Sequence, residues 1–207
     1  MTFTTPDKLL NDTLTTIEKR HSVRTFIERE VPDDIIDVLL RAANKAPSAH
    51  NQQPWRFFIL RDKKKHELAH LVTSNAGGFP KPASALLRMA ARSILSAPVV
   101  IAAANTGELI DHGTQLFKIE KEMARDFFRT MEIQSSAAAV ENLLLAATSL
   151  GLATVWLGIL FLMKDDVMHF LGEPKGEFMA VIPVGYPAKP SSGPQKKPLE
   201  MKVRYLD

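Results

Sequence analysis

Residues 130–150 constrain the fold more than any other segment of the sequence. This stretch, TMEIQSSAAAVENLLLAATSL, predicts a long helix that is small and apolar on nearly every face, with Gly151 as its C-cap. A helix that is apolar all round is buried, and its alanines let a second helix approach closely. The helix carries more apolar surface than one layered domain of 207 residues easily covers. We therefore expect it to lie at the core of a homodimer with a large interface.

The segments around this helix alternate between helical and strand-like patterns. Apolar runs predict buried strands at 55–60, 97–105 and 178–187. Helical patterns are predicted at 7–20, at 33–45 behind Pro32, from the charged stretch 61–67 onward, and at 84–95, with a Gly- and Pro-rich loop at 74–83. About four strands separated by helices predict a layered α/β or α+β domain. The C-terminal residues 188–207 begin as a flexible arm, and their last part alternates like an edge strand.

Composition limits the class of protein. Hydrophobic residues make up 45% and charged residues 24%, which predicts one globular domain over 1–207 with a sizeable core. There is no cysteine, so disulfide and thiolate chemistry are excluded. No signal peptide and no membrane-spanning run is recognised, so we expect a cytoplasmic protein. The net charge of +3 is too mild and scattered for a nucleic-acid surface, whereas a small anionic ligand would account for it.

The segment RHSVR at 20–24 predicts a phosphate contact. Arg20, Ser22 and Arg24 alternate, so they point the same way if the backbone is extended. Two guanidinium groups and a hydroxyl on one side suit a phosphate, although a solvated basic turn after a helix is the alternative. Near the other end, MKVRY at 201–205 places Lys202 and Arg204 two residues apart in a predicted strand, and an ordinary basic tail is the alternative.

The stretch APSAHNQQPW at 46–55 gathers amides at the mouth of a strand. Asn and Gln side chains offer both donor and acceptor, as the edge of a heterocycle requires, but they also cap turns. The stretch GLATVWLGIL at 151–160 brings two glycines around an apolar segment, so that backbone amides near Gly158 can approach a flat ligand; plain core packing is the alternative. No dinucleotide fingerprint, phosphate loop, nucleophile elbow or zinc motif occurs, and we expect no metal site.

Taken together and in order, these four motifs resemble those of the nitroreductase family of FMN-dependent oxidoreductases. The resemblance covers about residues 17–60, 130–160 and 178–206. It implies an α+β nitroreductase-like layered fold, with a central, mostly antiparallel sheet flanked by helices, in an intertwined homodimer. It also implies a variable middle region, 62–129, in which 106–129 is a possible substrate-side insertion.

The resemblance further implies which residues bind FMN. The N-terminal motif and the C-terminal pair would hold the phosphate and ribityl chain, the amide-rich loop would reach the flavin of the other subunit, and the segment after the buried helix would lie along the ring and offer an N–H to flavin N5. The implied cofactor-binding residues are Arg20, His21, Ser22, Arg24, Pro47, Ser48, Ala49, Asn51, Val155, Trp156, Leu157, Gly158, Lys202 and Arg204, with Gln52 and Ile159 nearby. This chain lacks the acid that some larger members carry near WLGI, and Arg88 and Arg92 are candidates for a cation near the flavin pyrimidine.

The activity implied is ping-pong hydride transfer. NADH or NADPH would reduce the flavin, and an electron-poor acceptor such as a nitroaromatic or a quinone would then take the hydride. The flavin carries the chemistry, so no catalytic side chain is expected. Three alternatives remain open: a flavin-fragmenting enzyme of the same fold, a reductive dehalogenase, and a non-catalytic flavin-binding module.

Overall fold

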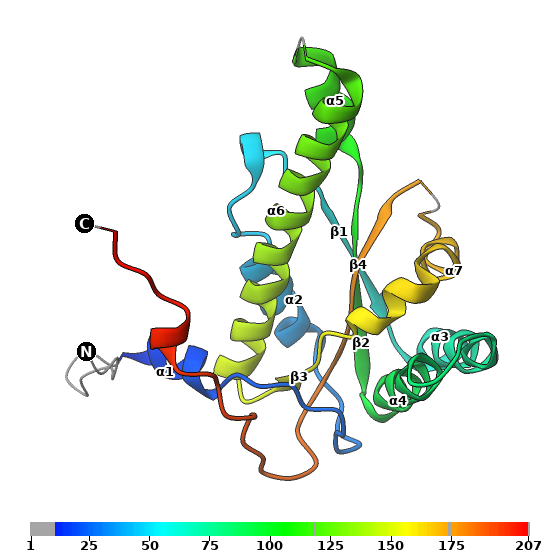
Figure 1. Ribbon diagram of the computed structural model, residues 1–207. Helices are drawn as coiled ribbons and strands as arrows, with labels where there is room; N and C mark the ends of the chain where they lie inside the picture. Colours follow the sequence, from blue (N-terminus) through cyan, green and yellow to red (C-terminus); the bar gives the residue numbers. More distant parts are fainter. Residues whose placement is uncertain (1–10, 118, 174, 207) are drawn as a thin grey trace.

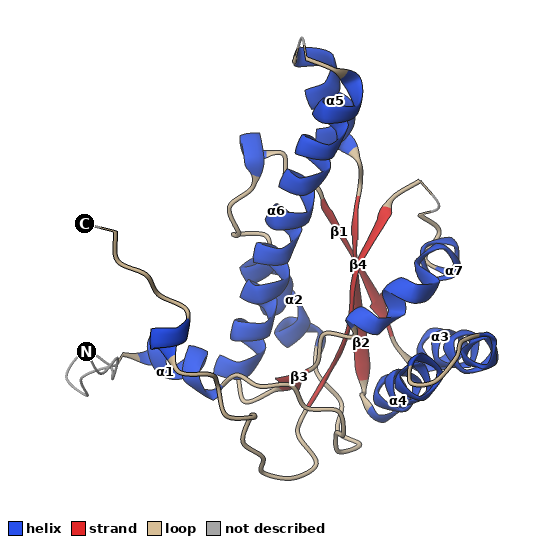
Figure 2. Cartoon of the chain, in the orientation of Figure 1, coloured by secondary structure: helices blue, strands red, loops and turns tan. Residues whose placement is uncertain are grey.

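A four-stranded antiparallel sheet lies between two layers of helices in the computed structural model, which describes residues 11–117, 119–173 and 175–206 (Figure 1, Figure 2). The sheet order is β1-β2-β4-β3, and each neighbouring pair is antiparallel. The strands are β1 (Trp55–Leu60), β2 (Val99–Asn105), β3 (Ala153–Thr154) and β4 (Glu177–Gly185). The predicted α+β fold with a mostly antiparallel sheet is confirmed.

Strand β2 occupies the middle of the sheet and explains the two layers. All seven of its residues are buried, because successive side chains point to opposite faces and each face is covered. Val100, Ala102 and Ala104 join one hydrophobic cluster, whereas Val99, Ile101 and Ala103 join the other. A strand that is buried on both faces has apolar residues at successive positions, and this continuous apolar run is the pattern that predicted β2.

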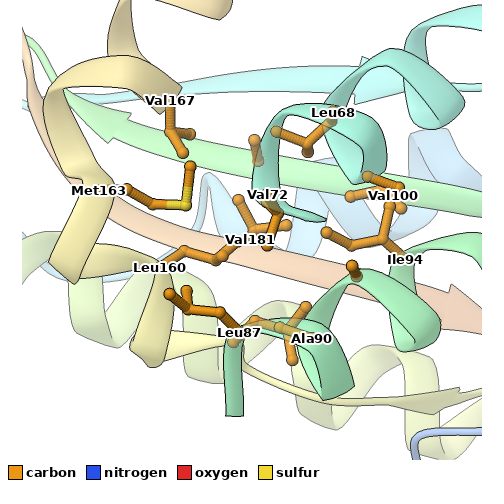
Figure 3. Close-up of a cluster of buried hydrophobic side chains, with 14 of the residues drawn as sticks. Leu68, Val72, Leu87, Ala90, Ile94, Val100, Leu160, Met163, Val167 and Val181 are labelled. Carbon is orange, nitrogen blue, oxygen red and sulfur yellow. The ribbon is translucent and has the colours of Figure 1, made fainter. Parts of the chain in front are cut away.

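The first helical layer contains α3 (Asp62–Asn75), α4 (Ala83–Ser96) and α7 (Lys164–Phe170). Its side chains meet those of β2 and β4 in a dense apolar cluster (Figure 3). Leu87 and Ile94 of α4 are fully buried there, beside Leu160 of the 3₁₀ segment Gly158–Met163. This packing fixes α4 and the segment that follows β3 relative to each other, which matters for the site below.

The second layer consists of α2 (Asp33–Ala43) and α6 (Lys121–Ser149), with α1 (Asp12–Lys19) against α6. The acids Asp33 and Asp34 stand in the first turn of α2, where they complement the helix dipole as predicted. Helix α5 (Glu108–Leu116) packs on the N-terminal part of α6 and forms the far end of the molecule in Figure 1.

Helix α6 begins nine residues before the predicted start at 130. The carboxylate of Glu120 accepts hydrogen bonds from the backbone N–H groups of Glu122 and Met123, so the sequence marks the start of the helix with a side-chain cap. The mixed stretch 106–128 therefore contains α5 and the first turns of α6. The predicted helix 7–20 is present as α1, and its residues 7–10 lie outside the described residues.

The predicted C-terminal edge strand at 201–205 is wrong. Leu199–Met201 forms a single 3₁₀ turn, and residues 202–206 have no strand assignment. A strand needs a neighbour for its backbone hydrogen bonds, and this segment runs past α1 and away from the sheet (Figure 1). Across residues 11–117, 119–173 and 175–206, no helix has the length and apolar character that crossing a membrane requires.

Candidate functional site

The RHSVR segment runs extended along the edge of the sheet. Ser22 forms a parallel bridge with Thr154 of β3, and the N–H of Val23 donates to the carbonyl of Thr154 at 2.9 Å. Val23 is buried, whereas Ser22 and Arg24 are exposed. The predicted alternation is therefore present over residues 22–24, and the bridge places the N-terminal motif directly beside the segment that follows β3.

Residues 155–158 are held against β4 by every second amide. The N–H groups of Val155 and Leu157 donate to the carbonyls of Pro183 and Val181, at 3.4 and 2.9 Å. Because alternate amides of an extended segment point to opposite sides, the N–H of Trp156 is directed away from β4. A Cβ added at Gly158 would meet no atom beyond its chain neighbours except Cδ1 of Trp156 at 4.0 Å, so there is space beside the backbone here.

These two motifs meet α4 around one cavity of about 190 Å³. One side is formed by Arg24, another by the segment 155–159, and the third by one face of α4. The α4 residues that line the cavity are Leu86, Met89, Ala90 and Ser93. A cationic group, backbone donors and an apolar helix face thus converge in one place, which is the combination that a flat ligand with an anionic tail requires.

Arg20 and His21 of the same motif have partners within the chain. Arg20 Nε lies 3.2 Å from a carboxylate oxygen of Glu141 on α6. The His21 ring contacts the carbonyl of Lys19 through Nδ1 at 2.9 Å and the hydroxyl of Ser191 through Nε2 at 2.8 Å. The His21 side chain therefore fastens the start of the C-terminal segment to the N-terminal motif, and a contact of either residue with a phosphate stays a prediction.

The amide-rich loop adopts an unusual backbone. His50, Asn51 and Gln53 have φ angles of 52°, 54° and 50°, a region that costs non-glycine residues energy and often marks functional loops. Part of its polarity serves the loop itself: Ser48 Oγ accepts from the N–H of Gln53 at 3.0 Å, and the Gln53 amide donates to Oδ1 of Asn51 at 3.2 Å. The exposed Asn51 is held in one place by these bonds.

Two contacts attach this loop to α6. The N–H of Ala49 donates to Ser135 Oγ at 3.2 Å, and the His50 ring lies 6.5 Å from the ring of Phe128. None of Pro47, Ser48, Ala49 or Asn51 lines the cavity beside Arg24. The cavity and the amide-rich loop are therefore two separate surfaces of one chain.

The C-terminal pair and the two candidate arginines of α4 lie elsewhere. Lys202 and Arg204 are exposed in the segment after Leu199–Met201, and neither lines the cavity beside Arg24. Arg88 and Arg92 are exposed on α4, on a different face from the one that lines the cavity. Arg24 is therefore the arginine that the structure places at the cavity, and the roles of the other four residues stay predictions.

Sequence reasoning missed a polar cluster near the start of α5. Glu132 of α6 is fully buried, and its Oε1 accepts from the N–H of Leu109 at 2.9 Å. Burial raises the pKa of Glu132, while the facing backbone N–H groups oppose that shift. Close by, both carboxylate oxygens of Glu177 accept from the guanidinium of Arg129, which is a bidentate pair. A single Glu within a helix gives no signal in the sequence, because its partner is a backbone amide 23 residues away.

The family follows from a comparison with known proteins. Residues 17–186 match the model of the nitroreductase family, which is most of the chain. The chain belongs to the nitroreductase family. The resemblance predicted from the four motifs is thus confirmed.

Relatives from distant organisms support the assignment. A protein of Methanothermobacter thermautotrophicus, named "Putative NADH dehydrogenase/NAD(P)H nitroreductase", is 31% identical over 190 residues, which span 86% of this chain and 78% of the relative. The NADH dehydrogenase of Thermus thermophilus is 28% identical over 93% of this chain and 95% of its own length. The predicted class, an NAD(P)H-dependent oxidoreductase, agrees with these names.

A solved structure shares the architecture. The BluB-like flavoprotein of Clostridium difficile has a TM-score of 0.72 and 26% identity, over 94% of this chain and 98% of that chain. This likeness extends over nearly the whole length of both chains.

Proposed function

We propose that this member of the nitroreductase family is an FMN-dependent NAD(P)H oxidoreductase that acts as a homodimer, with each flavin site shared between two copies. The observation that carries the proposal is the convergence of Arg24, the backbone of 155–158 and one face of α4 on a single cavity. Family membership and the names of the NAD(P)H-dependent relatives support it.

The residues around the cavity fit FMN. Arg24 supplies a permanent positive charge with several N–H donors, which suits a phosphate. The α4 face is apolar apart from Ser93, whose hydroxyl donates to the carbonyl of Met89, and an apolar wall suits one face of an aromatic ring system. Gly158 lines the cavity and has no side chain, so it leaves room for a ligand to approach the backbone closely.

The chemistry that bound FMN supplies is transfer of a hydride from NAD(P)H to an electron-poor acceptor in two separate half-reactions. The chain's own residues bind, orient and enclose. The N–H of Trp156 or Gly158 would donate to the ring edge, and the packed cluster behind α4 would keep that edge in place. Nitroaromatics and quinones are the acceptors we expect, and either NADH or NADPH would serve as the donor.

The second copy would complete the site. The amide-rich loop is strained, exposed at Asn51, and absent from the cavity of its own chain. We expect Pro47, Ser48, Ala49 and Asn51 to reach the flavin of the partner. The C-terminal segment exposes apolar side chains, including Met201 at 69% and Leu206 at 83%, which suits an arm laid over another chain. Such an arm would bring Lys202 and Arg204 to the phosphate.

Reductive dehalogenation is the second candidate activity. Human iodotyrosine deiodinase 1 is 28% identical over 203 residues, which span 89% of this chain and 65% of the deiodinase. The same cavity and the same cofactor would serve both activities, so the fold does not separate them. The products decide: release of halide from a halogenated aromatic would favour this candidate, and reduction of a nitroaromatic would favour the first.

Purification followed by spectroscopy tests the proposal. We expect a yellow protein that releases intact FMN on heating and loses its flavin absorbance when NADH or NADPH is added without oxygen. A protein that takes up no FMN at micromolar concentration would contradict the proposal. Bound flavin that neither nucleotide reduces would instead indicate a flavin-binding module, and loss of intact FMN during turnover would indicate a flavin-fragmenting enzyme.

A further inference from the structure

Glu132 of α6 has no part in the proposed flavin site, yet its carboxyl group lies in the protein interior. Its side chain is 0% exposed, and a buried carboxyl group is costly unless hydrogen bonds compensate. Oε1 accepts from the N–H of Leu109, which is itself fully buried. Within the part of the chain that the structure describes, Oε2 has no hydrogen-bond partner, and the side chain lines a cavity of about 460 Å³.

The N–H groups that face Glu132 belong to the start of α5. The first residues of a helix leave backbone N–H groups without intrahelical partners, and a side chain at the N-cap normally accepts from them. Here the N-cap is Gly107, which has a φ of 83° and no side chain. Glu132 takes over this function from another helix, because the N–H groups of Gly107, Leu109 and Ile110 all face its carboxyl group.

The same face of α6 holds α5 at a second point. Phe128 lies one turn before Glu132 and is 1% exposed, and its ring lies against Gly113 of α5, where any Cβ would collide with it. The Phe128 ring also lies near His50, and Ser135, one turn beyond Glu132, binds the N–H of Ala49. One stripe of α6 therefore positions both α5 and the amide-rich loop.

The far end of α5 presents an aromatic surface. The rings of Phe117 and Phe127 each lie edge-on to Phe128, with centroids 5.0 and 5.1 Å away, and both remain more than 40% exposed. Met123 beside them is 62% exposed. The buried Phe128 ring thus lies near both the amide-rich loop and the rings of Phe117 and Phe127, so that one side chain connects the aromatic surface to the loop.

We propose that Glu132 is a positioning residue that fixes α5 on α6, and that it thereby sets how large an aromatic acceptor fits against the flavin of the neighbouring copy. The inference rests on the proposed function for its second half, because it takes the amide-rich loop to reach that flavin. If the start of α5 is released, the helix can pivot on Phe128, and the Phe117 edge moves relative to the loop. A two-ring acceptor needs more of that aromatic wall than a one-ring acceptor, so its turnover is more sensitive to the position of α5.

Three variants of the holoenzyme test the inference. Glu132→Ala removes the hydrogen-bond acceptor of the Leu109 N–H, and Glu132→Gln keeps a hydrogen-bonding oxygen on a side chain of the same length. Glu122→Ala removes an exposed Glu from the same helix. The first readout is hydrogen exchange of the α5 amides. We expect roughly tenfold faster exchange in Glu132→Ala, as for a buried N–H that loses its partner, and near-normal exchange in the other two, with α4 unchanged in all three.

The second readout is the ratio of kcat/KM for menadione, which has two fused rings, to kcat/KM for 1,4-benzoquinone, with the same nucleotide. We expect a roughly tenfold lower ratio in Glu132→Ala at unchanged FMN content, and restoration of the ratio in Glu132→Gln. Should Glu132→Ala fail to fold, Glu132→Asp, one methylene shorter, is expected to change both readouts in the same direction by a smaller factor.

The possible outcomes separate the two halves of the inference. Unchanged α5 exchange in Glu132→Ala would overturn the role of Glu132 outright. Faster hydrogen exchange of the α5 amides in Glu132→Ala, with an unchanged ratio of the two kcat/KM values, would show that α5 does not contact the hydride acceptor. A wild-type protein that binds no FMN would overturn the proposed function and with it the acceptor half, while hydrogen exchange would still decide whether Glu132 holds α5.

Discussion

The cavity beside Arg24 and the amide-rich loop differ in almost every physical respect, although both carry motifs of the same family. The cavity is concave, its backbone is tied to β4, and a dense apolar cluster lies behind it. The loop connects α2 to β1 and contacts α6, and it has left-handed φ angles at His50, Asn51 and Gln53. The cavity and the strained loop lie apart within one chain, and this separation favours our proposal of a site shared between two copies.

The largest expected effect comes from filling the cavity. Gly158 lines the cavity, and a Cβ there would meet no closer side chain than Trp156 Cδ1 at 4.0 Å, so we expect Gly158→Leu to fold while the ligand loses its space. We expect FMN affinity to fall at least about 100-fold, or about 2.7 kcal/mol, measured by fluorescence titration. Gly77→Leu is the matched control, since Gly77 also has open space around it but lies in the 3₁₀ turn Ala76–Gly78 that follows α3. Full FMN binding by Gly158→Leu would contradict the assignment of this cavity as the FMN site.

Removing the charge at the cavity should have the next largest effect. Arg24→Ala deletes the guanidinium that lines the cavity, and a hydrogen bond to a charged group contributes about 1.5–3 kcal/mol, or roughly 10–150-fold in Kd. Calorimetry with FMN and with riboflavin separates the causes. The loss should be confined to FMN, because riboflavin lacks the phosphate. Arg41→Ala, an exposed arginine on α2, should leave both affinities unchanged; an equal loss for riboflavin would contradict a phosphate contact.

The stability of the fold should depend on pH through Glu132, which lies at the contact between α5 and α6. Burial raises the pKa of Glu132 in the folded protein. The contribution of the protonated carboxyl group to the free energy of unfolding is therefore complete below the ordinary Glu pKa of about 4.3, and it is lost as pH rises through the raised pKa. The charged groups that line the same cavity or face Glu132 come from α6, α7, β4 and the turn before β4. They are Arg125, Arg129, Lys164, Asp165, Lys175 and Glu177.

Glu132→Gln cannot ionise, so it should gain stability relative to the wild type as pH rises. We expect its melting temperature to match or fall below the wild-type value near pH 4 and to exceed it by about 2–4 °C at pH 7, in line with roughly 1 kcal/mol at this chain length. Differential scanning calorimetry at several pH values measures this difference. A difference that shrinks between pH 4 and pH 7 would show that the folded carboxyl group does not have a raised pKa.

The smallest effect is expected within the loop. Ser48→Ala removes the acceptor for the N–H of Gln53, which is worth about 0.5–1.5 kcal/mol to the loop conformation. We expect acceptor turnover to fall a few-fold in steady-state kinetics, while FMN retention changes little, since the cavity half is intact. Ser74→Ala on α3 serves as the control. A large loss of FMN instead would place Ser48 at the cofactor itself.

Much of the fold could be predicted because its signals are local. The continuous apolar run at 97–105 predicted a strand that is buried on both faces, and Pro32 with Asp33 predicted the start of α2. The C-terminal strand was predicted from alternation alone, but alternation does not supply a neighbouring strand, and residues 202–206 have none in the described chain.

The site was less predictable because it depends on contacts between distant segments. The motif RHSVR showed that cations were present, but only the folded chain shows that Arg24 lines the cavity whereas Arg20 pairs with Glu141 and His21 binds Ser191. Glu132 gave no signal at all, since its function as a cap depends on α5 having a glycine at its N-cap.

The shared site is the central claim, and mixing two damaged chains tests it most directly. Gly158→Leu damages the cavity, and Asn51→Pro damages the loop, because proline cannot adopt a φ of 54° and lacks the N–H that binds the carbonyl of Ser48. A heterodimer of the two, purified through two different tags, contains one site with both an intact cavity and an intact loop. We predict that the homodimers of each variant are inactive. We predict that the heterodimer binds about one FMN per two chains and recovers about half of the wild-type turnover. A heterodimer as inactive as its parents would contradict a site built from two copies.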